Sequence, residues 1–216
     1  MKINLISPVD PLLTPAQQIL INRGMTLENA NHLLNTTDDD IHSYNDLINM
    51  DEAVDTFLRH MRKDSGSRVV VQVDADVDGY TSAALIINYV NANYPHIDID
   101  FQVHPQKAHG LIMSEAILQN KYDLVIVPDA GSGEYDKHKE LKELNIDCIV
   151  LDHHEVDWDS PDAIVVNNQI SPQYSNKELS GVGVVWQFCR ALDDSGNGEG
   201  KTTANDYLDL VALGLD

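Results

Sequence analysis

The sequence predicts an α/β fold in which a mostly parallel β-sheet is flanked by helices and preceded by an N-terminal helical segment. From residue 68 onward, short runs of β-branched residues alternate with longer runs whose apolar residues have helical spacing. The β-branched runs are almost continuously apolar, which is typical of strands buried on both faces of a parallel sheet. Before residue 66, only helical patterns occur. These observations indicate βαβ units behind a helical N-terminal region.

Residues 1–65 are expected to form helices that pack on the core. A threonine–proline pair at residues 14–15 supplies an N-cap and a proline at the first helical position, and Gly24 stands where a glycine would end that helix. A second helix is expected at 26–34 and a third at 50–61, where apolar residues recur at helical spacing.

Residues 66–216 are expected to form the α/β domain. Its predicted strands lie at 69–73, 97–103, 123–127, 147–151 and 163–167. Helices are expected within 81–93, near 114–120, and at 137–144 and 181–194, followed by an apolar segment at 204–216. Strands that alternate with helices form βαβ units, so the sheet should be mostly parallel.

The composition excludes some classes of protein. The 216 residues contain 14 Lys and Arg against 35 Asp and Glu, which gives a formal net charge of −21 and argues against a general DNA-coating protein. Carboxylates that bind divalent cations contribute to the same negative total, so a metal enzyme remains compatible with it. No apolar run approaches the roughly 18 residues of a spanning helix, and we expect a cytoplasmic protein. Cys148 and Cys189 lie in apolar segments and are expected to be buried free thiols.

Acidic residues and histidines follow three of the predicted strands. The first strand is followed by Asp74, Asp76 and Asp78, the third by Asp129, and the fourth by Asp152, His153 and His154. Ligand sites of open parallel sheets lie outside the carboxyl ends of the strands, so these side chains should meet in one crevice. Clustered carboxylates repel one another, and a bound cation would remove that cost.

Each motif alone has another interpretation. The DADVDG segment resembles the start of an EF-hand, but position twelve of that loop would be Leu85 rather than glutamate. A solvated acidic turn and a helix cap with surface histidines remain alternatives for the single motifs; three motifs on three strand ends favour a metal site.

Carboxylates and imidazoles without paired thiols suit Mn²⁺, with Mg²⁺ as the alternative. Two such ions about 3.5 to 4 Å apart form a common apparatus for attack of water on a phosphoryl group. Gly181 and Gly183 open a predicted helix whose N–H groups could bind a phosphate, although close helix packing would also explain these glycines.

Several segments resemble, in order, motifs of the DHH phosphoesterases, and specifically of the RecJ branch of single-strand-specific exonucleases. The segments are VQVDADVDGYTSAALI, HPQKAHGLIMSEAI, LVIVPDAGS, IVLDHHE and VVNNQISPQYSNKELSGVGVVWQFCRAL. The resemblance implies that Asp74, Asp76, Asp78, Asp129 and His153 hold two metal ions, with Asp129 as the bridge. It further implies that Asp152 orients His153, that His154 faces the scissile phosphate, and that Gly181, Gly183 and Lys107 contact substrate phosphates.

The resemblance implies a Mn²⁺-dependent 5′-to-3′ exonuclease on single-stranded DNA, with a single-strand-binding protein or a helicase as partner. Besides Lys107, the cations expected to contact the strand are Lys177 and Arg190. The alternatives are a small-nucleotide phosphodiesterase or pyrophosphatase, which needs no long basic track, and a non-catalytic replication scaffold.

The end of the sequence departs from the family pattern. The fourth motif has a metal-binding aspartate four residues after the glycine that matches Gly214, whereas this sequence ends at Asp216. We expect either that Asp216 takes this role in a shifted register or, as the favoured interpretation, that the sequence is a fragment that is inactive alone. Asn167 also matches a family position, but the sequence gives no role for it.

Overall fold

A computed structural model describes residues 9–104 and 109–215 and divides the chain into two compact units, the first ending at His42 and the second beginning at Ser43. The first unit contains α1 (Pro15–Asn22), α2 (Leu27–Leu34) and a short 3-10 turn (Asp38–Asp40). Thr14 caps α1 through its side chain, as the sequence predicts, and the Thr26 side chain caps α2. A domain boundary at residue 65 stays a prediction.

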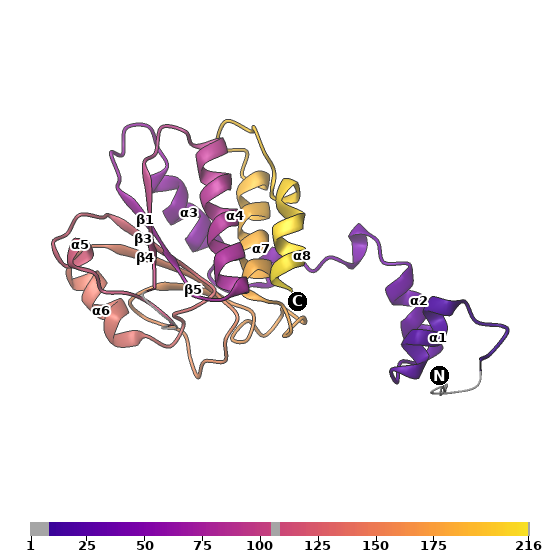
Figure 1. Cartoon of the computed structure of the whole chain (residues 1–216). Coiled ribbons are helices and arrows are strands. Elements are labelled where there is room, and N and C mark those ends of the chain that lie inside the picture. The colour runs from indigo at the N-terminus through magenta and orange to yellow at the C-terminus, as the bar shows by residue number, and fades with distance from the viewer. Residues whose placement is uncertain (1–8, 105–108, 216) are drawn as a thin grey trace, which may run out of the picture. The chain divides into compact units, whose positions relative to one another are not determined.

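The second unit is built on a five-stranded parallel sheet with the order β2-β1-β3-β4-β5, which confirms the predicted fold class (Figure 1). The strands are β1 (Val69–Val73), β2 (Ile99–Val103), β3 (Leu124–Pro128), β4 (Asp147–Asp152) and β5 (Ile164–Asn167). The direction of winding reverses between β1 and β3. In folds of this order, ligands bind at that switch point, outside the carboxyl ends of the strands.

Helices cover both faces of the sheet. They are α3 (Met50–His60), α4 (Val77–Asn93), α5 (Glu115–Leu118), α6 (Tyr135–Glu143), α7 (Gly181–Asp194) and α8 (Leu208–Gly214), with short 3-10 turns at Tyr44–Asp46 and Ala204–Tyr207. Alternate residues of β3 enter different cores: Leu124 and Ile126 join the core that includes residues of α3, α4 and α7, whereas Val125 packs with Leu141 of α6. Figure 1 shows α4, α7 and α8 together on one side of the sheet.

α4 begins at Val77, earlier than the apolar periodicity predicts. Asp76 is its N-cap, and the Asp76 Oδ1 accepts a hydrogen bond of 2.8 Å from the Gly79 N–H. A Cβ on Gly79 would lie 2.6 Å from the Asp74 Cβ, so only glycine allows the chain to turn this tightly from β1 into the helix. The early start places Asp78 in the first turn of α4.

Two further expectations concern the cysteines and membrane-spanning helices. Cys148 and Cys189 are buried free thiols, as predicted. Among residues 9–104 and 109–215, no helix has the length and apolar character needed to cross a membrane.

Candidate metal centre

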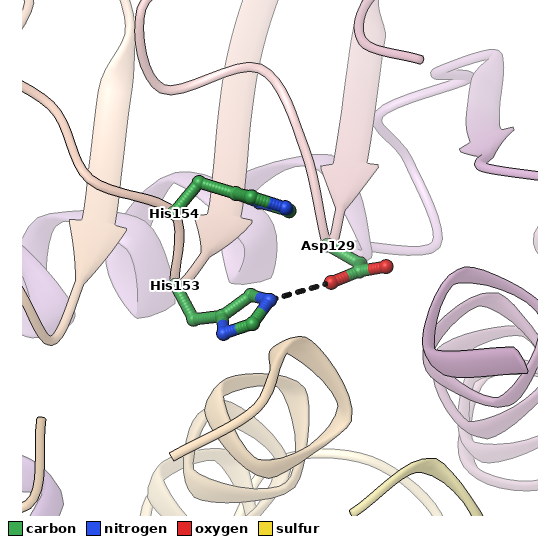
Figure 2. A group of neighbouring side chains, drawn as sticks. All are labelled: Asp129, His153 and His154. Atoms are coloured by element: carbon green, nitrogen blue, oxygen red, sulfur yellow. Dashed lines mark ion pairs between the residues drawn. The ribbon is translucent and has the colours of Figure 1, made fainter. Parts of the chain in front are cut away.

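The predicted acidic residues and histidines meet at the switch point of the sheet. Asp74 directly follows β1, Asp129 directly follows β3, and Asp152 is the last residue of β4. Figure 2 shows Asp129 at the end of one strand, facing His153 and His154, which follow the neighbouring strand. Ligating atoms of Asp129, His153 and His154 all lie within 4.8 Å of one another. The convergence that the strand ends predict is therefore present.

Asp129 is held in an unusual backbone conformation at the centre of this site. Its φ is 63°, in the left-handed region that aspartate tolerates better than most residues, and its N–H donates to the Leu151 carbonyl at 2.8 Å. The side chain is 1% exposed, and neither carboxylate oxygen has a hydrogen-bond partner among the described residues. Burial, reinforced by the charges of Asp78 and Asp76 and opposed by His153, raises the pKa of Asp129 to about 7.

Asp78 bridges the start of α4 to the start of α7. Its Oδ2 accepts from the Gly181 N–H at 2.8 Å, and its Oδ1 accepts from the Val182 N–H at 2.7 Å. A carboxylate at a helix N-terminus is favourable because unpaired N–H groups and the helix dipole both attract it. This contact fixes Asp78 3.6 Å from the His153 Nε2, measured from Oδ2.

Other side chains pack closely against the two glycines of α7. A Cβ on Gly181 would lie 2.6 Å from the Asp129 Cβ and nearer still to the Asp129 Oδ1. A Cβ on Gly183 would lie 2.6 Å from the Leu179 Cγ. The Gly181 N–H that was expected to face a phosphate is bonded to Asp78 instead, so phosphate binding by Gly181 and Gly183 stays a prediction.

Asp152 positions the ring of His154, whereas the sequence led us to expect that it orients His153. The Asp152 Oδ1 contacts the His154 Nδ1 at 2.8 Å and accepts the His153 backbone N–H at 2.7 Å, while Oδ2 accepts the Ser132 N–H at 3.0 Å. The ring of His153 points the other way, with its Nε2 3.3 Å from the Asp129 Oδ1. The residue two positions after Asp152 can fold back onto it, whereas the adjacent residue offers only its backbone.

These contacts separate the pKa values of Asp152 and His154. Burial favours the neutral form of Asp152, but hydrogen bonds from His154 and Ser132 outweigh it and lower the pKa to about 2. The Asp152 carboxylate raises the pKa of His154 to about 9. His154 is therefore protonated at neutral pH.

This pair predicts a pH-dependent contribution to the stability of the metal-free protein. The pKa of Asp152 falls below its ordinary 3.8, so its contribution is present above that pH and lost as the pH falls toward 2. The pKa of His154 rises above its ordinary 6.5, so its contribution is complete below pH 6.5 and lost as the pH rises through 9. We expect His154→Gln to lower the free energy of unfolding by about 1 kcal/mol between those limits, because half-exposed ion pairs are worth little more.

Urea unfolding of wild type and His154→Gln across this pH range measures that difference. The two proteins should converge as the pH rises past 9. A difference that stays constant or grows above that pH would contradict the ion pair.

A second cluster includes a residue that the strand ends do not predict. Atoms of Asp74, Asp76 and His109 lie within 4.8 Å of one another, and the His109 Nδ1 is 2.7 Å from the Asp74 Oδ2. This contact raises the pKa of His109, while the other oxygen of Asp74, Oδ1, is buried without a hydrogen-bond partner among the described residues. His109 comes from a loop, so no strand pattern in the sequence points to it.

Asn167, for which the sequence gives no role, supports the histidine pair. Its side chain is fully buried, and its Nδ2 donates to the Ser132 Oγ at 2.8 Å and to the His154 carbonyl at 3.0 Å. It thus ties β5 to the segment that carries both histidines. The Asp152 and His154 side chains line a 210 Å³ pocket with Asp74 and His109.

Of the cations expected to bind DNA, Lys177 and Arg190 contact other groups of the protein. Lys177 donates from its Nζ to the carbonyl oxygens of Asn168 at 2.5 Å and Ser171 at 2.7 Å, so its ammonium is engaged within the protein. The Arg190 guanidinium lies 4.9 Å from the centre of the Trp186 ring. Lys107, the remaining expected cation, and Asp216, the candidate fourth-motif ligand, lie outside the described residues.

The donor set fits a hard divalent cation. Three buried carboxylate oxygens, both of Asp129 and one of Asp74, have no hydrogen-bond partner among the described residues, and imidazoles lie beside each carboxylate. Buried carboxylates are costly even beside an imidazole, and a cation would add compensating charge. Oxygen and imidazole ligands without thiolates suit Mn²⁺ or Mg²⁺.

Comparison with known proteins identifies relatives of this chain. A sequence model of the DHH family, N-terminal domain, matches residues 68–215. YorK of Bacillus subtilis (strain 168), an SPbeta prophage-derived protein named as a single-strand DNA-specific exonuclease, is 40% identical over 214 residues, covering 99% of this chain and 36% of YorK. The single-stranded-DNA-specific exonuclease RecJ of the same organism is 30% identical over 210 residues, covering 94% of this chain and 25% of RecJ.

A crystal structure of exonuclease RecJ bound to manganese is similar to this fold with a TM-score of 0.67 and 27% identity, covering 78% of this chain and 42% of that one. The chain spans 36% of the length of YorK and 25% of the length of RecJ from Bacillus subtilis. The family match covers more than half of the chain and contains every residue of the candidate metal centre. The chain therefore belongs to the DHH family and is homologous to the RecJ exonucleases.

Proposed function

We propose that this chain carries the metal centre of a Mn²⁺-dependent phosphodiesterase that removes nucleotides from the 5′ end of single-stranded DNA. The observation that carries the proposal is the set of three buried carboxylate oxygens without hydrogen-bond partners among the described residues, on Asp129 and Asp74, at the switch point of the sheet. The imidazoles of His153 and His109 compensate these carboxylates only while they are protonated, whereas a bound cation would compensate them at any pH. The homologues named as single-strand-specific exonucleases support the substrate class.

The two clusters of acidic residues and histidines would each hold one ion. Asp129 and His153 would hold one ion, with Asp78 beside them, and Asp74 and Asp76 would hold the other, with His109 beside them. When bound, such ions neutralise charge on the phosphoryl oxygens and lower the pKa of water. Mn²⁺ is the proposed cofactor, with Mg²⁺ as the alternative.

His154 would contact the scissile phosphate directly. Asp152 fixes its ring through Nδ1, which leaves Nε2 to donate toward the 210 Å³ pocket that the ring lines. The Asp152 carboxylate raises the pKa of His154 and so favours the cationic ring, which would stabilise charge that develops on a phosphoryl oxygen. Ser132 and Asn167 hold this arrangement in place.

The charge of the chain adds an expectation about salt. With a formal net charge of −21 and Lys177 engaged within the protein, few phosphates can be neutralised by side chains. The slope of log affinity against log salt concentration should therefore be shallower than that of a basic DNA-binding domain. Association with a single-strand-binding protein or a helicase stays a prediction.

The test is an assay of the full-length protein with Mn²⁺ on four substrates: a 5′-phosphorylated single strand, a blunt duplex, a cyclic dinucleotide and pyrophosphate. We expect mononucleotides to be released from the 5′ end of the single strand and the duplex to be spared. Release from the 3′ end, or faster cleavage of the cyclic dinucleotide or pyrophosphate, would replace this proposal with a small-nucleotide hydrolase. Failure to cleave any substrate while Mn²⁺ binds would favour a scaffold.

A further inference from the structure

An aromatic pair lies on the segment that follows the histidines of the metal centre. Trp158 stacks on Tyr135 of α6 with ring centroids 5.5 Å apart and an interplanar angle of 17°. The Tyr135 hydroxyl also donates to the Trp158 carbonyl at 2.8 Å. Trp158 is nevertheless 60% exposed, which is too much for both of its ring faces to be covered.

The two residues that follow Trp158 are held by side-chain contacts. The Asp159 Oδ2 accepts from the Asn49 Nδ2 at 2.9 Å, and the Ser160 Oγ lies 3.0 Å from the Nδ1 of buried His138. Single exposed apolar residues are common on protein surfaces and need no explanation. A tryptophan that is stacked on one face, anchored through its own carbonyl and followed by two anchored residues is a different case, because its open face is held ready for a ligand.

One member of the aromatic pair, Tyr135, lines a groove that adjoins the 210 Å³ pocket. Tyr135 lines a 570 Å³ groove, and two residues of that groove, Gly133 and Glu155, also line the 210 Å³ pocket that contains His154. Trp158 follows His154 closely along the chain, so their Cα atoms are at most about 14 Å apart. A strand that continues from the pocket along this groove passes Tyr135, on which Trp158 stacks.

The chemistry of this groove selects a base rather than a phosphate. Glu155 and Asp157 line it and repel phosphates, whereas an aromatic face binds any nucleobase by stacking without a cation. We propose that the open face of Trp158, backed by Tyr135, is a stacking platform for one nucleobase of the substrate strand next to the metal centre. The inference rests on the proposed function and adds a base contact to it.

Intrinsic fluorescence tests the platform without hydrolysis. The chain contains two tryptophans, and the other one, Trp186, is 9% exposed and packed beneath Arg190. A short 5′-phosphorylated oligothymidylate should quench the emission of this metal-free 216-residue chain, and Trp158→Phe should remove that quenching. Quenching that persists in Trp158→Phe would overturn the proposal.

Kinetics with substituted proteins measure what the stacked base contributes. Trp158→Ala should raise KM for a single strand roughly five- to tenfold, the lower part of the range for loss of one stacked base, and leave kcat within about twofold. Trp158→Phe should restore KM, and Phe101→Ala, which removes an aromatic side chain that is 63% exposed on edge strand β2, should change nothing.

An abasic series locates the base that stacks. An abasic site at one position from the 5′ end should weaken binding to wild type and have no effect on Trp158→Ala, whereas equal sensitivity of both proteins at every position would overturn the platform. If quenching occurs but no strand is cleaved, the platform stands and the proposed exonuclease activity fails. If the strand is cleaved and Trp158→Ala changes neither KM nor binding, the exonuclease activity stands and the platform is overturned.

Discussion

Replacing Asp129 with asparagine is expected to abolish Mn²⁺ binding and, at the same time, to stabilise the metal-free protein. The buried carboxylate has no hydrogen-bond partner among the described residues, and its pKa is raised to about 7, so its charged form destabilises the fold at neutral pH. Asparagine has the same shape, tolerates the left-handed backbone at φ 63°, and carries no charge. The free energy of unfolding without metal should rise by on the order of 2 kcal/mol at neutral pH.

The pH dependence follows from the sign of this shift. A raised pKa means that the folded protein binds more protons than the unfolded chain between pH 3.8 and about 7, so wild-type stability falls as the pH rises through that range. The advantage of Asp129→Asn should therefore be absent below that range and complete above it. Thermal unfolding with and without Mn²⁺ measures both effects, because a ligand of the native state raises its apparent stability.

Asp64→Asn is the matched control for this charge change, since Asp64 is exposed in the loop before β1. It should leave both Mn²⁺ binding and the pH profile unchanged. If Asp129→Asn binds Mn²⁺ like wild type in calorimetric titration, Asp129 is not a ligand.

Replacing Gly181 with alanine is expected to weaken Mn²⁺ binding by about 10- to 100-fold, as loss of a supporting contact at a metal site typically does. The new Cβ would lie 2.6 Å from the Asp129 Cβ, so either Asp129 or the start of α7 must move. A shift of α7 would also break the hydrogen bonds from Gly181 and Val182 to Asp78. Overpacking of this kind costs about 1 to 3 kcal/mol of stability.

Two variants isolate the cause of this effect. Ser180→Ala, one residue earlier, removes a buried hydroxyl that has no hydrogen-bond partner among the described residues, and it should behave like wild type. In an Asp129→Gly background, Gly181→Ala should cost less stability than in wild type, because both the Cβ and the carboxylate that clash are gone and glycine tolerates the φ of 63° at this position. Equal costs in both backgrounds would show that the crowding of Asp129 is not the cause.

The fold was predictable because the strands are buried on both faces. β1 and β3 contain almost only β-branched or leucine residues, and β4 has a four-residue apolar run between two aspartates, so the positions of the strands, and with them the residues that follow, could be identified from composition alone. The start of α4 could not be predicted, because apolar periodicity begins after its first turn. Its N-cap, Asp76, was interpreted only as a metal ligand.

The site was predictable as a set of residues and not as a set of contacts. Strand ends bring Asp74, Asp129 and Asp152 to one edge, but they do not determine which neighbour each carboxylate faces. Asp152 therefore pairs with His154 instead of His153, and His109 joins the site from a loop. Side-chain direction depends on the turns beyond the strands, which no periodicity describes.

The central claim is that these side chains bind a divalent cation at the switch point of the sheet. Anomalous diffraction from crystals of the protein grown with Mn²⁺, recorded at the manganese absorption edge, tests it most directly. We predict an anomalous peak within coordination distance of Asp129 and His153. A map without a peak there, or with manganese bound only at other carboxylates, would contradict it.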